Sequence, residues 1–432
     1  MVEYAQILNY AIPLFLVLIL IEYVASLFVG VKVNSFFDTI SSLSSGITNV
    51  LKDVLGLSIV IIGYDWFLSH LAITHLQSNV LLYVLAFIGL DFAGYWVHRW
   101  CHVVNVFWNR HIIHHSSEEF NLSCALRQSV SEIFAIFTFT YIPMAIIGIP
   151  TKVIAMVAPI HLFAQFWYHT KLIGRMGILE YFLVTPSHHR VHHAINQLYM
   201  DKNYGQIFIF WDKIFGTFQP ELENEPPVFG VSRAVHTWNP WIINFQHLWL
   251  LIKDAWRTTF WKDKLRIWFM PTGWRPEDVS SLYPVPYTKE IYNRPKYDTK
   301  ASAVFKYWSA AQLIITLLLM MFLFNNIGEI PFSEVLLYGI LLFVSIFAYT
   351  SLMDGSGLAI AAETVKSGIG LYLLSYNGYR WFEIDQTIPG GTIVIMTYLA
   401  TSLLSTLYFY FKDRPVPDFV LPEYKAFSAI EQ

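Results

Sequence analysis

Long apolar stretches recur along this 432-residue chain and constrain its fold more than any other feature. A helix that crosses a lipid bilayer needs about 20 predominantly apolar residues. Nine stretches reach or approach that length: residues 10–31, 47–64, 80–101, 133–148, 151–170, 307–324, 335–353, 357–374 and 392–411. Charged residues make up only 14% of the chain, whereas soluble domains carry about 25%. The sequence therefore predicts an all-α fold, a polytopic membrane helical bundle.

These stretches differ in how clearly they predict a span. The first is expected to be a retained span, because no Lys or Arg precedes it and the basic region of a signal peptide is missing. Residues 47–64 form the weakest candidate, since Lys52 and Asp53 lie near their start. Residues 133–148 and 151–170 predict an apolar hairpin that turns at Gly148, Ile149 and Pro150.

Lys and Arg residues are distributed unevenly between the two sides that the spans define. If the ends of residues 80–101 and of the hairpin lie on one side, 25 of the 28 Lys and Arg residues lie there as well. Lys and Arg are enriched on the cytoplasmic side of membrane proteins. We therefore expect a multi-pass integral membrane protein whose Lys- and Arg-rich side is cytoplasmic, in the endoplasmic reticulum of a eukaryote or the inner membrane of a bacterium.

Composition divides the chain into four regions. N-terminal transmembrane helices occupy residues 1–79, a histidine-cluster domain residues 80–235, a tryptophan-rich interfacial cap residues 236–305, and C-terminal transmembrane helices with a tail residues 306–432. The cap holds seven tryptophans between Trp238 and Trp274, with Lys and Arg residues interleaved. This pattern is typical of an amphipathic helix in the membrane interface, although a helix in the core of the cap would also account for it.

Histidine is concentrated in one part of the chain, on the side expected to be cytoplasmic: 11 of the 15 histidines lie between His98 and His193. Side chains three and four residues apart share a face of a helix, so HxxxH and HxxHH patterns direct several imidazoles at one metal ion. Adjacent histidines diverge by about 100° around the helix axis and are able to serve two different ions. The three clusters are HRWCH (His98 and His102), HIIHH (His111, His114 and His115) and the last part of HHRVHH (His189, His192 and His193).

A further pair, Gln165 and His169, lies four residues apart near the end of the hairpin. His169 brings the number of candidate ligands to nine, and Gln165 is either a tenth ligand or a side chain that supports one. Two ions with four or five ligands each would use all nine histidines. Burying so many imidazoles without a cation would leave many polar groups unsatisfied, so we expect a di-metal site. Imidazole suits iron, zinc, copper and nickel, and the residue types alone do not choose among them.

Other polar residues near the clusters are candidates for supporting roles. Asp91 lies two turns before the first cluster and is able to orient a ligand imidazole, although an interior hydrogen-bonded role is equally consistent. His188, Asn203 and Tyr204 lie beside the third cluster and are candidates for holding its histidines in place. Structural or surface roles are expected for His161, His70, His75, His236 and His247, and packing for Cys101.

Several other classes of protein are disfavoured. A net charge of −3 provides no basic field for nucleic acid. The two cysteines, Cys101 and Cys124, form no CxxC motif. The chain also lacks HExxH, Walker and GxSxG motifs and any flavin or nicotinamide fingerprint. An oxidase of this sequence would therefore take its electrons from an external reductant.

Four segments between residues 91 and 218 contain the clusters and carry a family resemblance: DFAGYWVHRWCH, HIIHHSSEEFNLSCALRQS, QFWYHT and TPSHHRVHHAINQLYMDKNYGQIFIFWDKIFGTF. They resemble the fatty acid hydroxylase/sterol desaturase superfamily and, within it, the alkylglycerol monooxygenase branch. The resemblance implies that residues 80–235 form a catalytic domain with a non-haem di-iron centre, which hydroxylates a lipid C–H bond with O₂. For the branch it also implies cleavage of the ether bond of alkylglycerols, with tetrahydrobiopterin as the reductant.

One residue departs from the branch. Its animal members carry a Glu directly after the second histidine of the first cluster, where Val103 stands here. The departure leaves the candidate ligands unchanged and weakens the implication of tetrahydrobiopterin.

Three functions are consistent with these residues. A di-iron lipid monooxygenase is the leading hypothesis, with a lipid from the bilayer, O₂ and an external reductant as its partners. A sterol or fatty acid desaturase or hydroxylase that uses the same centre is the alternative. A metal transporter or sensor is disfavoured, because its histidines and acidic residues would be spread along several spans. Zinc is able to take the place of iron in a purified sample, so metal identity needs elemental analysis.

Overall fold

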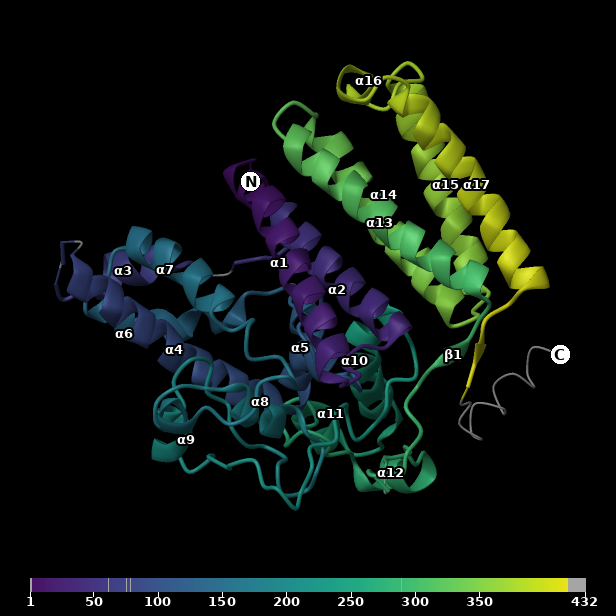
Figure 1. Cartoon of the computed structure of the whole chain (residues 1–432). Coiled ribbons are helices and arrows are strands. Elements are labelled where there is room, and N and C mark those ends of the chain that lie inside the picture. Colours follow the sequence, from purple (N-terminus) through teal and green to yellow (C-terminus); the bar gives the residue numbers. More distant parts are fainter. Residues whose placement is uncertain (1, 61, 75, 78, 289, 419–432) are drawn as a thin grey trace.

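Six long apolar helices dominate the computed structural model, which describes the chain except residues 1, 61, 75, 78, 289 and 419–432 (Figure 1). Each is long and apolar enough to cross a membrane: α1 (Val2–Val29), α4 (Val80–Val103), α13 (Ala303–Asn326), α14 (Phe332–Met353), α15 (Leu358–Tyr376) and α17 (Gly391–Lys412). Two short strands, β1 (Thr299–Lys300) and β2 (Val416–Pro417), pair antiparallel. The structure confirms the predicted all-α, polytopic fold.

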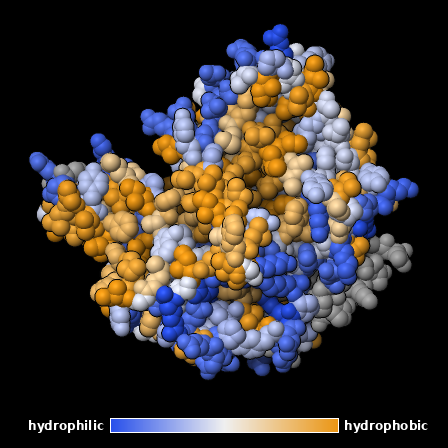
Figure 2. All heavy atoms as spheres, viewed as in Figure 1, coloured by the Kyte–Doolittle hydropathy of each residue, from blue (hydrophilic) through white to orange (hydrophobic). Residues whose placement is uncertain are grey.

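The helices are arranged in two groups. The C-terminal helices α13, α14, α15 and α17 form one bundle, and α1 lies along α13 (Figure 1). The second group contains α4, α3 (Tyr64–Leu71), α6 (Ile142–Ile146) and α7 (Thr151–Phe163). Figure 2 shows hydrophobic side chains gathered over α1 and over the second group, and hydrophilic ones along the lower part of the molecule.

Residues 47–64 do not form a span, contrary to the prediction. The helix α2 (Phe36–Val54) ends at Val54, and most of its side chains are buried inside the protein. Its serines bond to neighbouring elements: Ser44 Oγ lies 2.6 Å from Tyr349 Oη, and Ser41 Oγ donates to Trp238 O at 2.8 Å. Such a polar face needs protein partners, because lipid tails offer no hydrogen bonds. The serine-rich residues before position 47 belong to the same helix, so α2 is an interior helix.

The predicted hairpin is present, but its two arms are shorter than membrane-spanning helices. Its first arm consists of the 3₁₀ helix η2 (Ile136–Tyr141) and α6, and its second arm, α7, ends at Phe163. The turn lies at Gly148, which has a φ of +78°. A Cβ at this position would lie 1.9 Å from the carbonyl oxygen of Thr74, so the close approach requires glycine. Residues after Phe163 leave the helix and carry His169 in a loop.

Shorter helices between α4 and α13 form the rest of the histidine-cluster domain and the cap. They are α5 (Asn105–His115), η1 (Cys124–Leu126), η3 (Gly177–Tyr181), α8 (Pro186–His193), α9 (Phe210–Ile214), α10 (Pro240–Arg257), α11 (Trp261–Arg266) and α12 (Glu277–Leu282); α16 (Ile384–Thr387) precedes α17. In α10, Leu250 and Leu251 are buried, whereas Trp249 and Trp256 are 57% and 86% exposed. One face of α10 packs against α5, and the exposed tryptophans leave the membrane-interface location a prediction.

A buried ion pair lies inside the C-terminal bundle. Lys366 Nζ lies 2.6 Å from Glu363 Oε1, one turn away on α15, and both side chains are almost fully buried. Lys366 also donates to Ser402 Oγ of α17 at 2.6 Å, and Gln312 of α13 donates to the same oxygen at 2.9 Å. Charged groups inside a membrane protein are costly unless they are paired. The network therefore joins α13, α15 and α17.

We expect the substitution Lys366→Met to lower the free energy of unfolding by about 3–5 kcal/mol, because it leaves the Glu363 carboxylate buried without its partner. The double variant Lys366→Met/Glu363→Gln removes both charges and should regain most of this loss. Thermal and denaturant unfolding in detergent measures both effects. A single variant as stable as the wild type would show that the ion pair does not hold the bundle together.

Candidate metal centre

Three helices and one loop bring the nine clustered histidines together. The helical conformation is interrupted between α4 and α5 at Val104, whose extended backbone pairs with Pro271 of the cap. Asn105, buried at the start of α5, donates to the carbonyl oxygens of Ile267 and Trp274, each at 3.0 Å. Because these contacts with the cap fix the interruption between the helices, the histidines of HRWCH at the end of α4 face those of HIIHH on α5.

The third cluster lies on α8, a short helix in which every side chain is buried. Pro186 lies in its first turn, where a missing N–H is tolerated. Arg190, between the histidines, donates to both oxygens of Glu221. The same guanidinium donates to the carbonyl oxygens of Thr170 and Ile173 at 3.1 and 2.7 Å. Arg190 therefore joins α8 to the loop that carries His169.

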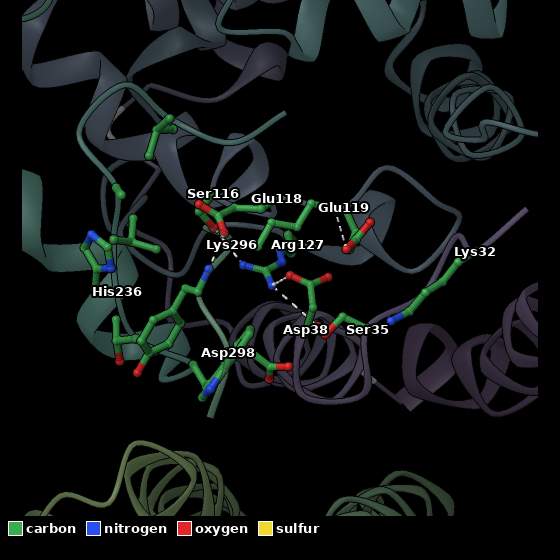
Figure 3. Close-up of a pocket in the computed structure, with 16 residues that line it drawn as sticks. Lys32, Ser35, Asp38, Ser116, Glu118, Glu119, Arg127, His236, Lys296 and Asp298 are labelled. Carbon is green, nitrogen blue, oxygen red and sulfur yellow. Dashed lines mark hydrogen bonds and ion pairs between the residues drawn. The ribbon is translucent and has the colours of Figure 1, made fainter. Parts of the chain in front are cut away.

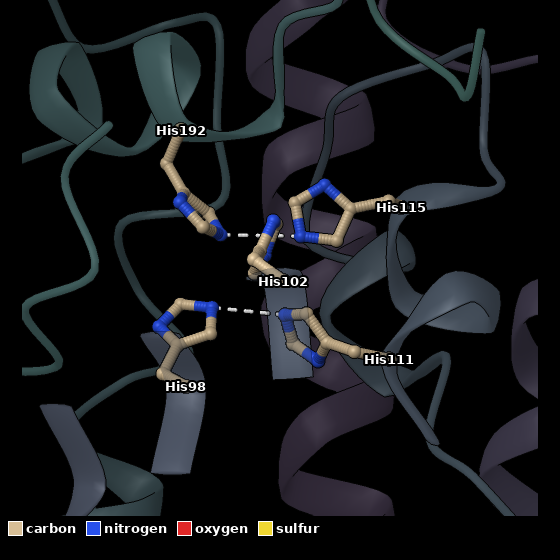
Figure 4. A group of neighbouring side chains, drawn as sticks. All are labelled: His98, His102, His111, His115 and His192. Atoms are coloured by element: carbon tan, nitrogen blue, oxygen red, sulfur yellow. Dashed lines mark hydrogen bonds between the residues drawn. The ribbon is translucent and has the colours of Figure 1, made fainter. Parts of the chain in front are cut away.

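The histidine rings fall into two groups. Within each group, every histidine offers one ring nitrogen, and these nitrogens all lie within 4.8 Å of one another. Figure 4 shows the five rings of the first group converging on a common space. Adjacent histidines, such as His114 and His115, belong to different groups. The first group contains His98, His102, His111, His115 and His192, and the second contains His114, His169, His189 and His193.

Backbone carbonyls fix the orientation of several rings. A carbonyl oxygen only accepts, so the ring nitrogen that faces it carries the proton and the other nitrogen keeps its lone pair. The Nε2 atoms of these rings are therefore acceptors, which is the form in which imidazole binds a metal. Four rings donate through Nδ1: His98 to Tyr204 O at 2.8 Å, His114 to Arg127 O at 3.3 Å, His169 to Gln165 O at 3.1 Å and His192 to Lys202 O at 2.9 Å.

The facing nitrogens of the second group are too close for free lone pairs. His114 Nε2 and His169 Nε2 lie 3.3 Å apart, and His193 Nε2 lies 3.1 Å from His114 Nε2. In the first group, the Nε2 atoms of His98 and His111 are 2.9 Å apart. Two nitrogens bound to one ion at ~2.1 Å lie roughly 3.0–3.4 Å apart. The donor sets therefore fit two ions that prefer imidazole.

Burial keeps these rings uncharged. The pKa values of His189, His192 and His193 lie well below the usual range, because burial disfavours the charged form and neighbouring imidazoles add to the effect. Burial also lowers the pKa of His169 to about 3. Neutral imidazoles bind a metal without first losing a proton. His102 Nε2 is buried and forms no hydrogen bond to the part of the chain that the structure describes, and a metal ion would satisfy it.

Asp91 bonds to a histidine outside both groups. Its Oδ1 accepts from His161 Nε2 at 2.9 Å, and its Oδ2 accepts from Trp211 Nε1 at 2.9 Å. The backbone N–H groups of Ile207 and Phe208 also donate to this carboxylate. Of the two roles considered for Asp91, the structure shows the interior one, in which it holds His161 and residues 207–211 against α4. His161 joins neither group, and its structural role stays a prediction.

The other supporting candidates differ in what they touch. His188 donates through Nδ1 to Leu183 O at 3.2 Å and joins neither group. Asn203 donates to His188 O at 3.1 Å and so anchors the backbone of α8. The backbone carbonyls of Tyr204 and Gln165 accept from the rings of His98 and His169, and the Tyr204 ring lies 5.3 Å from the His102 ring.

The isolated histidines and Cys101 lie apart from the groups. His70 stacks on Trp66, and His247 donates to Asn105 O at 2.9 Å. His236 also lies outside the groups, and Cys101 is buried within α4 without joining either. His75 is outside the described residues.

A buried ion pair between Arg127 and Asp38 lies beside the second group and was not predicted from the sequence. Arg127 Nη2 lies 2.7 Å from Asp38 Oδ1, and the backbone carbonyl of Arg127 accepts from His114. Both residues line a polar cavity of about 240 Å³, in which Ser116 also contacts the guanidinium (Figure 3). Arg127 belongs to the HIIHH segment, but Asp38 lies 89 positions earlier on α2. No local pattern links two residues so far apart.

Two aromatic rings cover the second group. The Phe120 ring lies 5.3 Å from the His193 ring and 5.9 Å from the His169 ring. The Tyr168 ring lies 4.4 Å from the His189 ring. Both aromatic side chains are buried, so they separate these imidazoles from water.

Comparison with known proteins agrees with this arrangement. The sequence model of the fatty acid hydroxylase family matches residues 83–217. The alkylglycerol monooxygenase of Homo sapiens is 33% identical over 88% of this chain and 84% of its own length, and that of Danio rerio is 32% identical over 94% and 89%. The ornithine lipid hydroxylase of Rhizobium tropici is 28% identical over 35% of this chain and 46% of its own length. No solved structure matches the chain.

These relatives are monooxygenases and hydroxylases, which supports an oxidoreductase that acts on membrane lipids. The match to the alkylglycerol monooxygenases extends well beyond the histidine clusters and covers most of the chain. The alkylglycerol monooxygenases are thus relatives of this chain over most of its length, and the chain belongs to the fatty acid hydroxylase family.

Proposed function

We propose that this protein is a non-haem di-iron monooxygenase that uses O₂ to hydroxylate a lipid C–H bond, on the carbon beside the ether oxygen of an alkylglycerol. The observation that carries the proposal is the pair of adjacent groups, in which nine imidazoles, eight of them buried, offer five and four nitrogens. The match to the fatty acid hydroxylase family favours iron as the metal. The relatives named alkylglycerol monooxygenases favour an ether lipid as the substrate. A sterol or fatty acid hydroxylase or desaturase with the same centre is the alternative.

Different residues of the chain would bind the metal, orient its ligands and exclude water. Two iron ions, held by the first and second groups, would supply the oxidant that an apolar C–H bond requires. The carbonyls of Tyr204 and Gln165 hold ligand rings in position. Phe120 and Tyr168 exclude water from the second group, which protects a reactive centre from side reactions.

The overall reaction balances with an external reductant. One oxygen atom of O₂ enters the lipid as a hydroxyl group, and the other leaves as water after two electrons and two protons are supplied. A hydroxyl on the carbon beside the ether oxygen makes a hemiacetal, which breaks its second C–O bond to give an aldehyde and a glycerol. The electrons come from outside the chain, because its sequence carries no flavin or nicotinamide fingerprint.

A cavity of about 430 Å³ on the cap side gives such a reductant a route to the centre. His102, His115, His192 and His193 line it directly, and α10 and residues 272–275 cover it. Tetrahydrobiopterin is one candidate, and Val103 lies close to this route, since its carbonyl accepts from the N–H of Thr272 in the cavity wall. The charge distribution supports a cytoplasmic location for the centre, which a soluble reductant would reach.

The test is to incubate membranes that contain the protein with a labelled alkylglycerol, with and without tetrahydrobiopterin. The proposal predicts an O₂-dependent fatty aldehyde and free glycerol. Turnover without the pterin would overturn that cofactor and leave the metal centre intact. A hydroxylated sterol or fatty acid, or a new C=C bond, would select the alternative. An iron-loaded protein that oxidises none of these lipids would contradict both.

A further inference from the structure

A second cavity, of about 420 Å³, lies between α4, α7 and residues 132–141. The two helices lie side by side at the apolar left-hand edge of the molecule (Figure 1). Large hydrophobic side chains beside the cavity are exposed, among them Phe134 at 51%, Phe139 at 45% and Leu162 at 64%. A surface of this kind faces lipid when the neighbouring helices cross a membrane. The cavity is therefore within reach of a bilayer lipid.

Several residues that line this α4–α7 cavity are linked to members of the histidine groups. Its lining residues Val97 and Arg110 directly precede His98 and His111 of the first group. Gln165, another lining residue, holds His169 of the second group through its carbonyl. The cavity shares no lining residue with the cap cavity. The two cavities are therefore separate.

The charges in the wall are paired. Arg110 Nη1 lies 3.0 Å from Glu132 Oε1, so this guanidinium is already neutralised. His161, the other basic side chain in the wall, is bonded to the Asp91 carboxylate. Nothing in this wall favours a carboxylate or phosphate, because desolvating a charge without a partner is costly. The cavity suits an uncharged lipid.

A chain of hydrogen bonds fixes two amides at the polar end of the cavity. The Asp91 carboxylate accepts, so His161 Nε2 carries the proton and His161 Nδ1 accepts. Gln165 Nε2 lies 3.2 Å from His161 Nδ1 and must therefore be the donor there. The same Nε2 also donates to His161 O at 3.2 Å and lies 3.5 Å from Gln206 Oε1, which faces it as an acceptor. Both amides are thereby oriented.

Among the residues that the structure describes, no hydrogen-bond partner engages the remaining polar atom of either amide. Gln206 Nε2 is a donor, and Gln165 Oε1 is an acceptor. An ether oxygen only accepts, and a hydroxyl group is able to donate, so an ether beside a free hydroxyl matches the pair. A saturated hydrocarbon chain offers neither group, and a carboxylate offers no donor.

We propose that the α4–α7 cavity binds the lipid substrate and that Gln206 and Gln165 position it, with Gln206 Nε2 donating to the ether oxygen and Gln165 Oε1 accepting from the adjacent hydroxyl. The inference rests on the proposed function and assigns to Gln165 and Gln206 the selection of an ether lipid as substrate. An ether oxygen at this amide would lie beside Val97 and Arg110, the lining residues that precede His98 and His111.

Gly94 offers a way to move Gln206 without removing it. A Cβ at position 94 would lie 2.0 Å from Gln206 Oε1, the far end of a flexible side chain. The substitution Gly94→Ala should therefore displace the amide while α4 persists. Gly368→Ala, on α15, is the matched control, because a Cβ there meets nothing within 4 Å.

The first experiment measures binding of two lipids of equal length to the purified, iron-loaded protein: an alkylglycerol and an alkane-1,2-diol that lacks the ether oxygen. Wild type and Gly368→Ala should bind the ether roughly tenfold more tightly, which is the effect of one hydrogen bond in a buried site. Gln206→Leu and Gly94→Ala should bind both lipids equally, with iron content unchanged. A preference for the ether that survives in both variants would overturn the role of Gln206.

The second experiment locates the lipid by crosslinking an alkylglycerol that carries a photoreactive group beside the ether. Labelled peptides from residues 132–141 and 158–165 would support the inference. Labelling of peptides that contain Ile195, Met200, Leu250 or Leu251, which line the cap cavity, would overturn it and leave the proposed function intact. Labelling of the α4–α7 cavity in a protein that oxidises no lipid would reject the proposed function and retain the binding site.

Discussion

Replacing His192 or His193 with Ala should release metal and reduce lipid oxidation by roughly a thousandfold or more, since a bound metal contributes several kcal/mol to such chemistry. The two residues are adjacent in the chain but belong to different groups. Each single variant should therefore lose mainly one of the two ions. Elemental analysis of the purified variants and product analysis with an alkylglycerol measure the two effects together.

His188→Ala is the matched control, because it lies on the same short helix and is equally buried. Its imidazole bonds to Leu183 O and joins neither group. The variant should keep both ions and most of its turnover. Equal metal loss from His188→Ala and His193→Ala would mean that α8 as a whole tolerates no substitution, and the assignment of ligands would lose its support.

Removing the metal should destabilise the protein strongly. Without ions, the facing lone pairs of rings such as His114 and His169, 3.3 Å apart, have no shared cation, and the nine clustered imidazoles lose their main partner. Ions that bind only the folded protein stabilise it by mass action. We expect chelation to lower the melting temperature by on the order of 10 °C, measured by scanning calorimetry or fluorescence in detergent.

Refilling the chelated protein separates structure from chemistry. Zinc should restore the melting temperature but not lipid oxidation, because zinc undergoes no redox change. Iron should restore both. The double variant His192→Ala/His193→Ala should show little further loss on chelation. A chelated wild type that melts at its original temperature would argue that the histidine groups hold no metal.

The sequence predicted the histidine groups well because their geometry is local. Spacings of three and four residues place imidazoles on one helical face, and adjacent histidines diverge. In the structure, His114 and His115 accordingly belong to different groups. The loop residue His169 was found from its spacing to Gln165, although residues after Phe163 are not helical.

The errors arose where the outcome depends on distant contacts. Residues 47–64 read as a weak span, but the serines of α2 bond to Tyr349 and Trp238, far along the chain. For Asp91 the sequence left two roles open, because its partner His161 lies 70 positions away. Arg127 and Asp38 were missed for the same reason. Hydropathy and spacing describe one element at a time and contain no information on such partners.

The central claim is that the two histidine groups hold iron that inserts oxygen from O₂ into a lipid. The most direct test is a single turnover of protein loaded anaerobically with two ferrous ions per chain, in the presence of an alkylglycerol and ¹⁸O₂. The account predicts about one fatty aldehyde per chain, which carries ¹⁸O when it is trapped before exchange with water. Full iron occupancy with O₂ consumed and no oxidised alkylglycerol, sterol or fatty acid would contradict it.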